Sequence, residues 1–130
     1  MKRPLEKWER KYYHSLEAYI DLPLAIDSVE LWWDDSLDTR NGILGYFKIQ
    51  KPSRIYLQMY NGSIQNDAVY KFWAKKMFST VAHEMQHMLD YRTHPLMYVA
   101  GSAPFLRRYT IEPRAKKIEL EVERQIKEMK

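Results

Sequence analysis

The segment from Asn66 to Tyr91 contains no glycine and no proline, the two residues that most strongly interrupt a helix. Within this segment, apolar side chains recur at spacings of three and four residues, which is the period of an α-helix. They are Val69, Phe72, Trp73, Met77, Val81, Met85, Met88 and Leu89. The pattern predicts one long helix over residues 66–91, and the rest of the chain must pack around it.

Shorter patterns predict the elements that surround this helix. Residues 5–19 carry an apolar stripe of helical spacing that stops before Pro23, and a second stripe predicts a last helix from about Thr110 onward. Runs of branched and aromatic residues predict strands at residues 28–33, 45–50 and 54–60, and the last two of these are expected to form an antiparallel hairpin. Pro113 suits the last helix only within its first turn.

We therefore predict a single domain of the α+β class over residues 1–130. It should contain an N-terminal helix, a small three-stranded and mostly antiparallel sheet, the long helix and a C-terminal helix. Residues 93–104 contain two prolines and a glycine. They are expected to connect the last two helices, with at most a short helical turn.

The composition narrows the kinds of site that this chain can build. It has 130 residues, of which 45% are hydrophobic, and no cysteine. Without cysteine, disulfides, thiolate zinc sites and a cysteine nucleophile are excluded, and histidine and carboxylates are left as the strong metal ligands. No segment has the roughly 18 apolar residues of a membrane span, and the first residues have no signal-peptide core. We expect a cytoplasmic protein with no membrane partner.

The predicted long helix carries the pattern H-E-x-x-H as His83-Glu84-Met85-Gln86-His87. Residues four apart lie one turn apart on the same helix face, so His83 and His87 can bind one tetrahedral Zn²⁺. Glu84 projects beside them, where it can accept a proton from a water molecule that the metal has acidified and carry it to the leaving amine. The motif predicts a zinc site with Glu84 as the catalytic base.

A catalytic zinc site of this kind requires a third protein ligand, and three residues are candidates. His94 follows His87 by seven residues, a spacing that does not fit the metzincin pattern. Glu112 lies at the start of the predicted last helix, and Glu119 lies two turns further on the same face. We favour Glu112 because Ala115, one turn later, leaves room for two helices to approach each other.

These residues resemble a compact gluzincin, a zinc metallopeptidase with a glutamate as third ligand, and are most similar to the ImmA/IrrE-like metallopeptidases. The segment Glu112-Pro113-Arg114-Ala115 is similar to the E-x-x-A of that group, in which the glutamate binds the metal. The SprT-like group, with a histidine as third ligand, is the second choice.

The resemblance extends to the predicted strands. Gly45-Tyr46-Phe47 and the later run Arg54, Ile55, Tyr56 and Leu57 resemble two strands of small zincin-like peptidases. In those enzymes the second of the two is the edge strand that holds an extended peptide substrate. The resemblance therefore implies that Arg54 to Leu57 bind the substrate through β-augmentation.

The sequence thus favours a zinc-dependent endopeptidase that acts on a protein or peptide substrate. Tyr109, three residues before Glu112, is the candidate stabiliser of the transition state. The alternative is a zincin-like binding module for a protein or nucleic acid, in which the metal site is not catalytic. The net charge of +4 lies mostly in residues 107–130, but basic and acidic residues alternate there, so nucleic-acid binding is only weakly supported.

Overall fold

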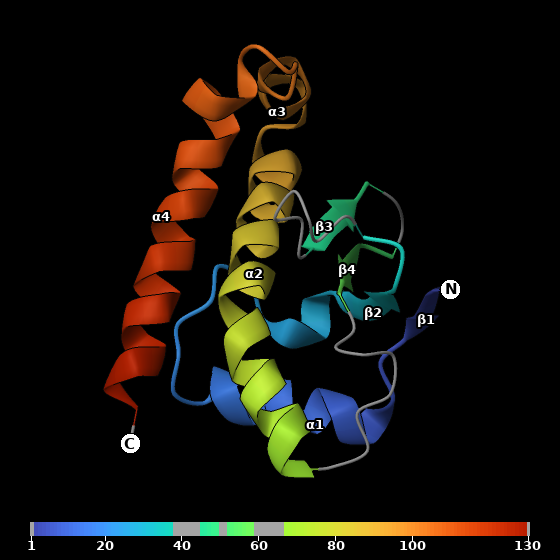
Figure 1. Cartoon of the computed structure of the whole chain (residues 1–130). Coiled ribbons are helices and arrows are strands. Elements are labelled where there is room, and N and C mark those ends of the chain that lie inside the picture. Colours follow the sequence, from blue (N-terminus) through green and yellow to red (C-terminus); the bar gives the residue numbers. More distant parts are fainter. Residues whose placement is uncertain (1, 38–44, 50–51, 59–66, 130) are drawn as a thin grey trace.

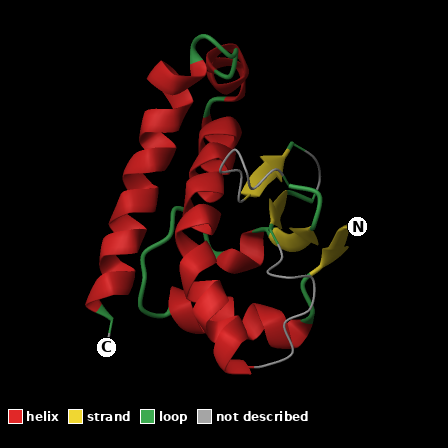
Figure 2. Cartoon of the chain, viewed as in Figure 1, coloured by secondary structure: helices red, strands yellow, loops and turns green. Residues whose placement is uncertain are grey.

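The computed structural model of the chain describes residues 2–37, 45–49, 52–58 and 67–129, and within them it has the α+β architecture predicted from the sequence (Figures 1 and 2). The elements are, in order, β1 (Lys2–Pro4), α1 (Lys7–Glu17), the short 3-10 helix η1 (Ile26–Ser28), β2 (Glu30–Asp34), β3 (Gly45–Lys48), β4 (Arg54–Leu57), α2 (Asp67–Thr93), α3 (Pro95–Gly101) and α4 (Arg107–Glu128).

The sheet differs from the prediction in its number of strands. Four strands of the described residues form it, in the order β1-β2-β4-β3, so the prediction of three strands is wrong. The missed strand, β1, is only three residues long and ends in a proline, which gives almost no strand pattern. β3 and β4 pair antiparallel as predicted, but β2 and β4 run parallel, so the sheet is mixed.

The position of β4 overturns the predicted role of Arg54, Ile55, Tyr56 and Leu57. β4 pairs with β2 on one side and with β3 on the other, so it is an interior strand with no free edge for a peptide. Ile55 and Leu57 are fully buried in the core. β3 is the strand at this edge of the sheet, and among the described strands β4 is its only partner.

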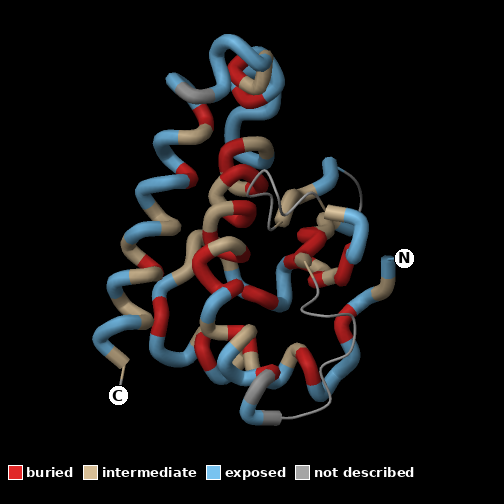
Figure 3. Tube along the Cα trace, viewed as in Figure 1, coloured by how far each residue is buried: buried red, intermediate tan, exposed pale blue. Residues whose placement is uncertain are grey.

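Helix α2 is the central element of the molecule. It contacts α1, β3 and β4 on one side and α4 on the other, so it lies between the sheet and the C-terminal helix (Figure 1). Buried residues are accordingly concentrated in α2 and the strands, whereas α4 is exposed along much of its length (Figure 3). Two-sided burial explains why so many apolar residues stand in the 66–91 segment.

The C-terminal part of the chain is more helical than predicted. The predicted connection contains the seven-residue helix α3, which begins at Pro95. Helix α4 begins at Arg107 rather than near Thr110, so Pro113 lies inside the helix and outside its first turn. Because proline has no N–H group, Pro113 cannot donate a helical hydrogen bond at this position. No helix in the described ranges combines the length and hydropathy that crossing a membrane requires.

A buried carboxylate joins helix α1 to the strands β1 and β2. Glu9 of α1 accepts hydrogen bonds from Arg3 of β1 at 2.7 and 3.2 Å and from the indole Nε1 of Trp33 of β2 at 2.7 Å. It also accepts one from the backbone N–H of Glu6 at 2.9 Å. Glu9 is only 2% exposed, so each of its oxygens is satisfied by protein groups rather than by bulk water.

We expect Glu9→Ala to lower the free energy of unfolding by about 2–4 kcal/mol, because it leaves the buried Trp33 N–H without a partner and Arg3 without its counter-charge. Urea unfolding followed by tryptophan fluorescence measures this loss. Glu128→Ala is the control, since it removes only an exposed ion pair with Arg124 and should change stability by less than about 1 kcal/mol. Equal losses in the two variants would contradict this structural role of Glu9.

Candidate metal centre

His83, His87 and Glu112 come together between α2 and α4. Each offers a ligand atom, and these three atoms all lie within 4.8 Å of one another. The Nε2 atoms of His83 and His87 lie 3.2 and 3.1 Å from the two carboxylate oxygens of Glu112. The two histidines share one face of α2 because they are one turn apart, and the glutamate comes from the helix packed across that face. Sequence reasoning had named all three as ligands.

The chemistry of this cluster fits a divalent cation. His87 is fully buried, and within the described residues neither of its ring nitrogens has a hydrogen-bond partner, which is costly unless something else binds them. Burial, with smaller contributions from His83 and Arg107, lowers the pKa of His87 to about 4, so its ring is neutral at pH 7 and offers a lone pair. Two imidazoles and a carboxylate form a ligand set typical of catalytic zinc sites. These three residues could hold a metal ion.

The electrostatic state of Glu112 also suits a metal ligand. Burial acts to raise the pKa of its carboxyl, but His87, Arg107 and His83 outweigh burial and the pKa is lowered. Arg107 donates a hydrogen bond from Nε to Glu112 Oε1 at 2.8 Å. The carboxylate is therefore charged at neutral pH. Ala115, one turn further along α4, is fully buried, in keeping with a close approach of the two helices at this level.

Glu84 lies beside the cluster and is only 8% exposed to solvent. Its side chain is buried, and it belongs to α2, whereas the backbone of Phe47 that hydrogen-bonds to it belongs to the edge strand β3. Burial, together with the negative charge of Glu112, raises the pKa of Glu84 to about 8, while Arg107 and the Phe47 backbone partly oppose this shift. A carboxyl with so high a pKa beside possible metal ligands is typical of a catalytic acid or base.

Two groups near the cluster escaped the sequence analysis. The ring of Tyr98 on α3 lies 6.1 Å from the His87 ring, and its buried hydroxyl has a raised pKa because of burial. The charge of Arg107 acts on Glu84, His87 and Glu112. Tyr98 and Arg107 lie in the segment that connects His87 to Glu112. Because this segment joins two predicted ligands of one site, its residues could have been considered as neighbours of the site.

The remaining sequence candidates lie outside the three-residue group. Glu119 Oε1 lies 2.8 Å from Nδ1 of His83, on the side of the ring away from the Nε2 atom that faces Glu112. His94 is exposed at the start of α3. Tyr109 is 68% exposed, so the structure gives it no buried position beside Glu84.

No family model, no curated protein and no solved structure matches the chain. The chemistry of the site is therefore inferred from its own residues. Within the described part of the chain, His83, His87 and Glu112 are the group whose geometry suits a metal ion.

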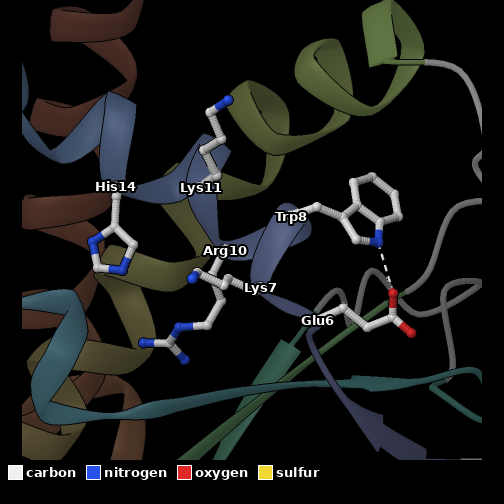
Figure 4. A pocket seen from close by; sticks show the side chains of 6 residues that line it. All are labelled: Glu6, Lys7, Trp8, Arg10, Lys11 and His14. Atoms are coloured by element: carbon white, nitrogen blue, oxygen red, sulfur yellow. Dashed lines mark hydrogen bonds between the residues drawn. The ribbon is translucent and has the colours of Figure 1, made fainter.

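A surface depression of about 950 Å³ along α1 offers no comparable site. It is lined by Glu6, Lys7, Trp8, Arg10, Lys11 and His14, and these side chains point in different directions instead of toward a common centre (Figure 4). Trp8 donates a hydrogen bond to Glu6, and Arg10 donates one to the carbonyl of Ile26. These polar groups are already used within the fold.

The basic residues of α4 are largely paired with acidic ones. Arg124 forms ion pairs with Glu121 and Glu128, and Lys116 pairs with Glu119. Arg114 binds Asp90 of α2 through two hydrogen bonds of 3.1 Å. These pairs reduce the positive field that nucleic-acid binding through this helix would require.

Proposed function

We propose that this chain is a zinc-dependent endopeptidase of the compact gluzincin type, with a zincin-like arrangement of its central helix and sheet. The observation that carries the proposal is the convergence of His83, His87 and Glu112 next to the buried Glu84. A purely structural metal site has no need of a general base, so the presence of Glu84 beside the ligand set favours catalysis.

In this proposal His83, His87 and Glu112 hold Zn²⁺, which when bound supplies an acidified water molecule and polarises the scissile carbonyl. The Glu84 carboxylate accepts a proton from the attacking water and donates it to the nitrogen of the leaving amine. A cation held by the neighbouring ligand set would lower the pKa of Glu84 from about 8, because a nearby positive charge stabilises the carboxylate. Glu84 is then ionised and able to act as the base near neutral pH.

The proposed substrate is an extended segment of a protein. β3 is the edge strand beside the cluster, and its Phe47 has its ring 6.1 Å from that of His87 and its backbone next to Glu84. A peptide that adds to the outer edge of β3 would therefore pass close to the reacting groups. Large apolar side chains are also exposed on α3 and around the start of α4, namely Leu96, Met97, Val99, Phe105, Leu106 and Tyr109. Such a surface suits a polypeptide better than a small polar molecule.

Removal of the metal is expected to abolish cleavage. The chain loaded with one equivalent of Zn²⁺ should cut an unstructured protein such as β-casein, and dialysis against a chelator should reduce the rate to background. Zinc added back should restore it, because the ligand residues remain in place. Mass spectrometry of the products measures each step and gives the cleavage positions.

Two controls make this experiment decisive. Mg²⁺ in place of Zn²⁺ should not restore cleavage, since imidazole ligands favour zinc over magnesium. A zinc-loaded chain that cuts neither casein nor a diverse peptide library would contradict the peptidase proposal. The alternative of a binding module with a non-catalytic metal would then be favoured.

A further inference from the structure

His83 contacts two carboxylates through its two different ring nitrogens. Nε2 lies 3.2 Å from Glu112 Oε2, inside the candidate metal centre, and Nδ1 lies 2.8 Å from Glu119 Oε1. An imidazole that binds a metal through one nitrogen carries a proton on the other, and that N–H needs an acceptor. Glu119 is the charged group in position to accept it.

The surroundings of Glu119 suit such a role. It stands seven residues after Glu112, two turns along the same face of α4, so both carboxylates face α2. Its side chain is only 18% exposed, and its second oxygen, Oε2, lies 2.5 Å from Nζ of Lys116. The lysine holds one oxygen of the carboxylate on the solvent side and leaves the other directed at His83.

His87 is positioned by different means. Its Nδ1 has no hydrogen-bond partner in the described part of the chain, and its ring is packed near the rings of Phe47 and Tyr98, at 6.1 Å from each. The side chain of His83 is less buried, at 16% exposed against 0% for His87. Nδ1 of His83 lies close to Glu119 Oε1, but the two atoms are not aligned as a hydrogen bond. A small rotation of the His83 ring would align them.

We propose that Glu119 is a positioning residue that accepts a hydrogen bond from Nδ1–H of His83. The bond keeps the lone pair of His83 on Nε2 and turned toward Glu112, so that His83 is ready to bind the metal. This inference rests on the zinc site of the proposed function but not on peptidase activity. It also assigns Glu119 a place outside the ligand set, in contrast to its role as an alternative third ligand in the sequence analysis.

The zinc affinity of variants at this position tests the proposal. Competition with a chromophoric chelator should show that Glu119→Ala binds Zn²⁺ about 10–100-fold more weakly than the wild type, still with one ion per chain. Glu119→Gln should lose less, because its amide oxygen can still accept the N–H of His83. Glu121→Ala is the matched control, since it removes a carboxylate of α4 that pairs with Arg124, and its zinc affinity should equal that of the wild type.

The absorption spectrum of the Co²⁺-loaded protein gives a second readout that is independent of catalysis. Glu119→Ala should keep the tetrahedral band intensity, because the ligands are unchanged. Loss of metal binding as complete as in Glu112→Ala would make Glu119 a ligand and overturn the proposal. An unchanged zinc affinity, with or without lower stability of the metal-free chain, would overturn it as well. A wild type that binds zinc but cuts no peptide contradicts only the peptidase function.

Discussion

Replacement of Glu84 by glutamine is expected to lower peptide turnover by about 10²–10⁴-fold while the zinc content stays at one ion per chain. Glutamine has nearly the same size and can still accept a hydrogen bond, but it cannot take a proton from the attacking water. Glu84 does not belong to the three residues that converge on the metal position, so their arrangement should survive the change. Turnover is measured on the peptide identified with the wild type, and zinc by elemental analysis of the same preparation.

Glu121→Gln makes the same chemical change at a half-exposed residue of α4 that pairs with Arg124, and it should leave turnover unchanged. If Glu84→Gln retained wild-type turnover with zinc bound, the role of Glu84 as general base would be disproved. If it lost zinc together with activity, Glu84 would instead contribute to metal binding. The two measurements on one preparation therefore separate a catalytic from a ligand role.

Glu112→Ala is expected to weaken zinc binding by on the order of 10³-fold, since it removes one of three protein ligands from a site whose total binding free energy is roughly 12 kcal/mol. The oxygens of Glu112 lie 3.2 and 3.1 Å from the Nε2 atoms of His83 and His87, so no other described carboxylate is equally placed to complete the set. Competition with a chelator of known affinity measures the change.

His94→Ala provides the comparison for this experiment. His94 is exposed at the start of α3 and lies outside the ligand group of the described residues, so its variant should bind zinc like the wild type. The opposite result, with zinc lost in His94→Ala and retained in Glu112→Ala, would exclude the glutamate ligand. The chain would then be closer to the peptidases that use a third histidine.

The parts of the site that the sequence predicted are those fixed by helix geometry. His83 and His87 share a helix face because of the period of 3.6 residues, and that relation holds in any helix regardless of its neighbours. Glu112 was found because a third ligand had to come from downstream of the motif and because Ala115 indicated a close helix contact. The structure brings all three together, and it places Glu119 against the opposite nitrogen of His83.

The order of the strands in the sheet could not be predicted from local sequence patterns. Alternation of side chains shows that residues 54–57 form a strand, but it does not show which strands lie on either side. The parallel pairing of β2 with β4 depends on how the chain crosses from one strand to the other. The short strand β1 pairs with β2, but its three residues are too few to show a strand pattern in the sequence. The sequence analysis therefore placed β4 at the edge of the sheet, whereas the edge strand is β3. Tyr98 was missed for a similar reason, because its relation to His87 arises only from the packing of α3.

The arrangement of α4 has a consequence for the energetics of the molecule. α4 packs mainly on α2, with fewer contacts to α3, and much of its surface is exposed (Figure 3). A local opening that detaches α4 would leave the sheet and α2 folded. An ion bound by His83, His87 and Glu112 would link the two helices across 25 residues of chain and oppose this opening. Its binding energy would then appear chiefly as slower amide hydrogen exchange in α4.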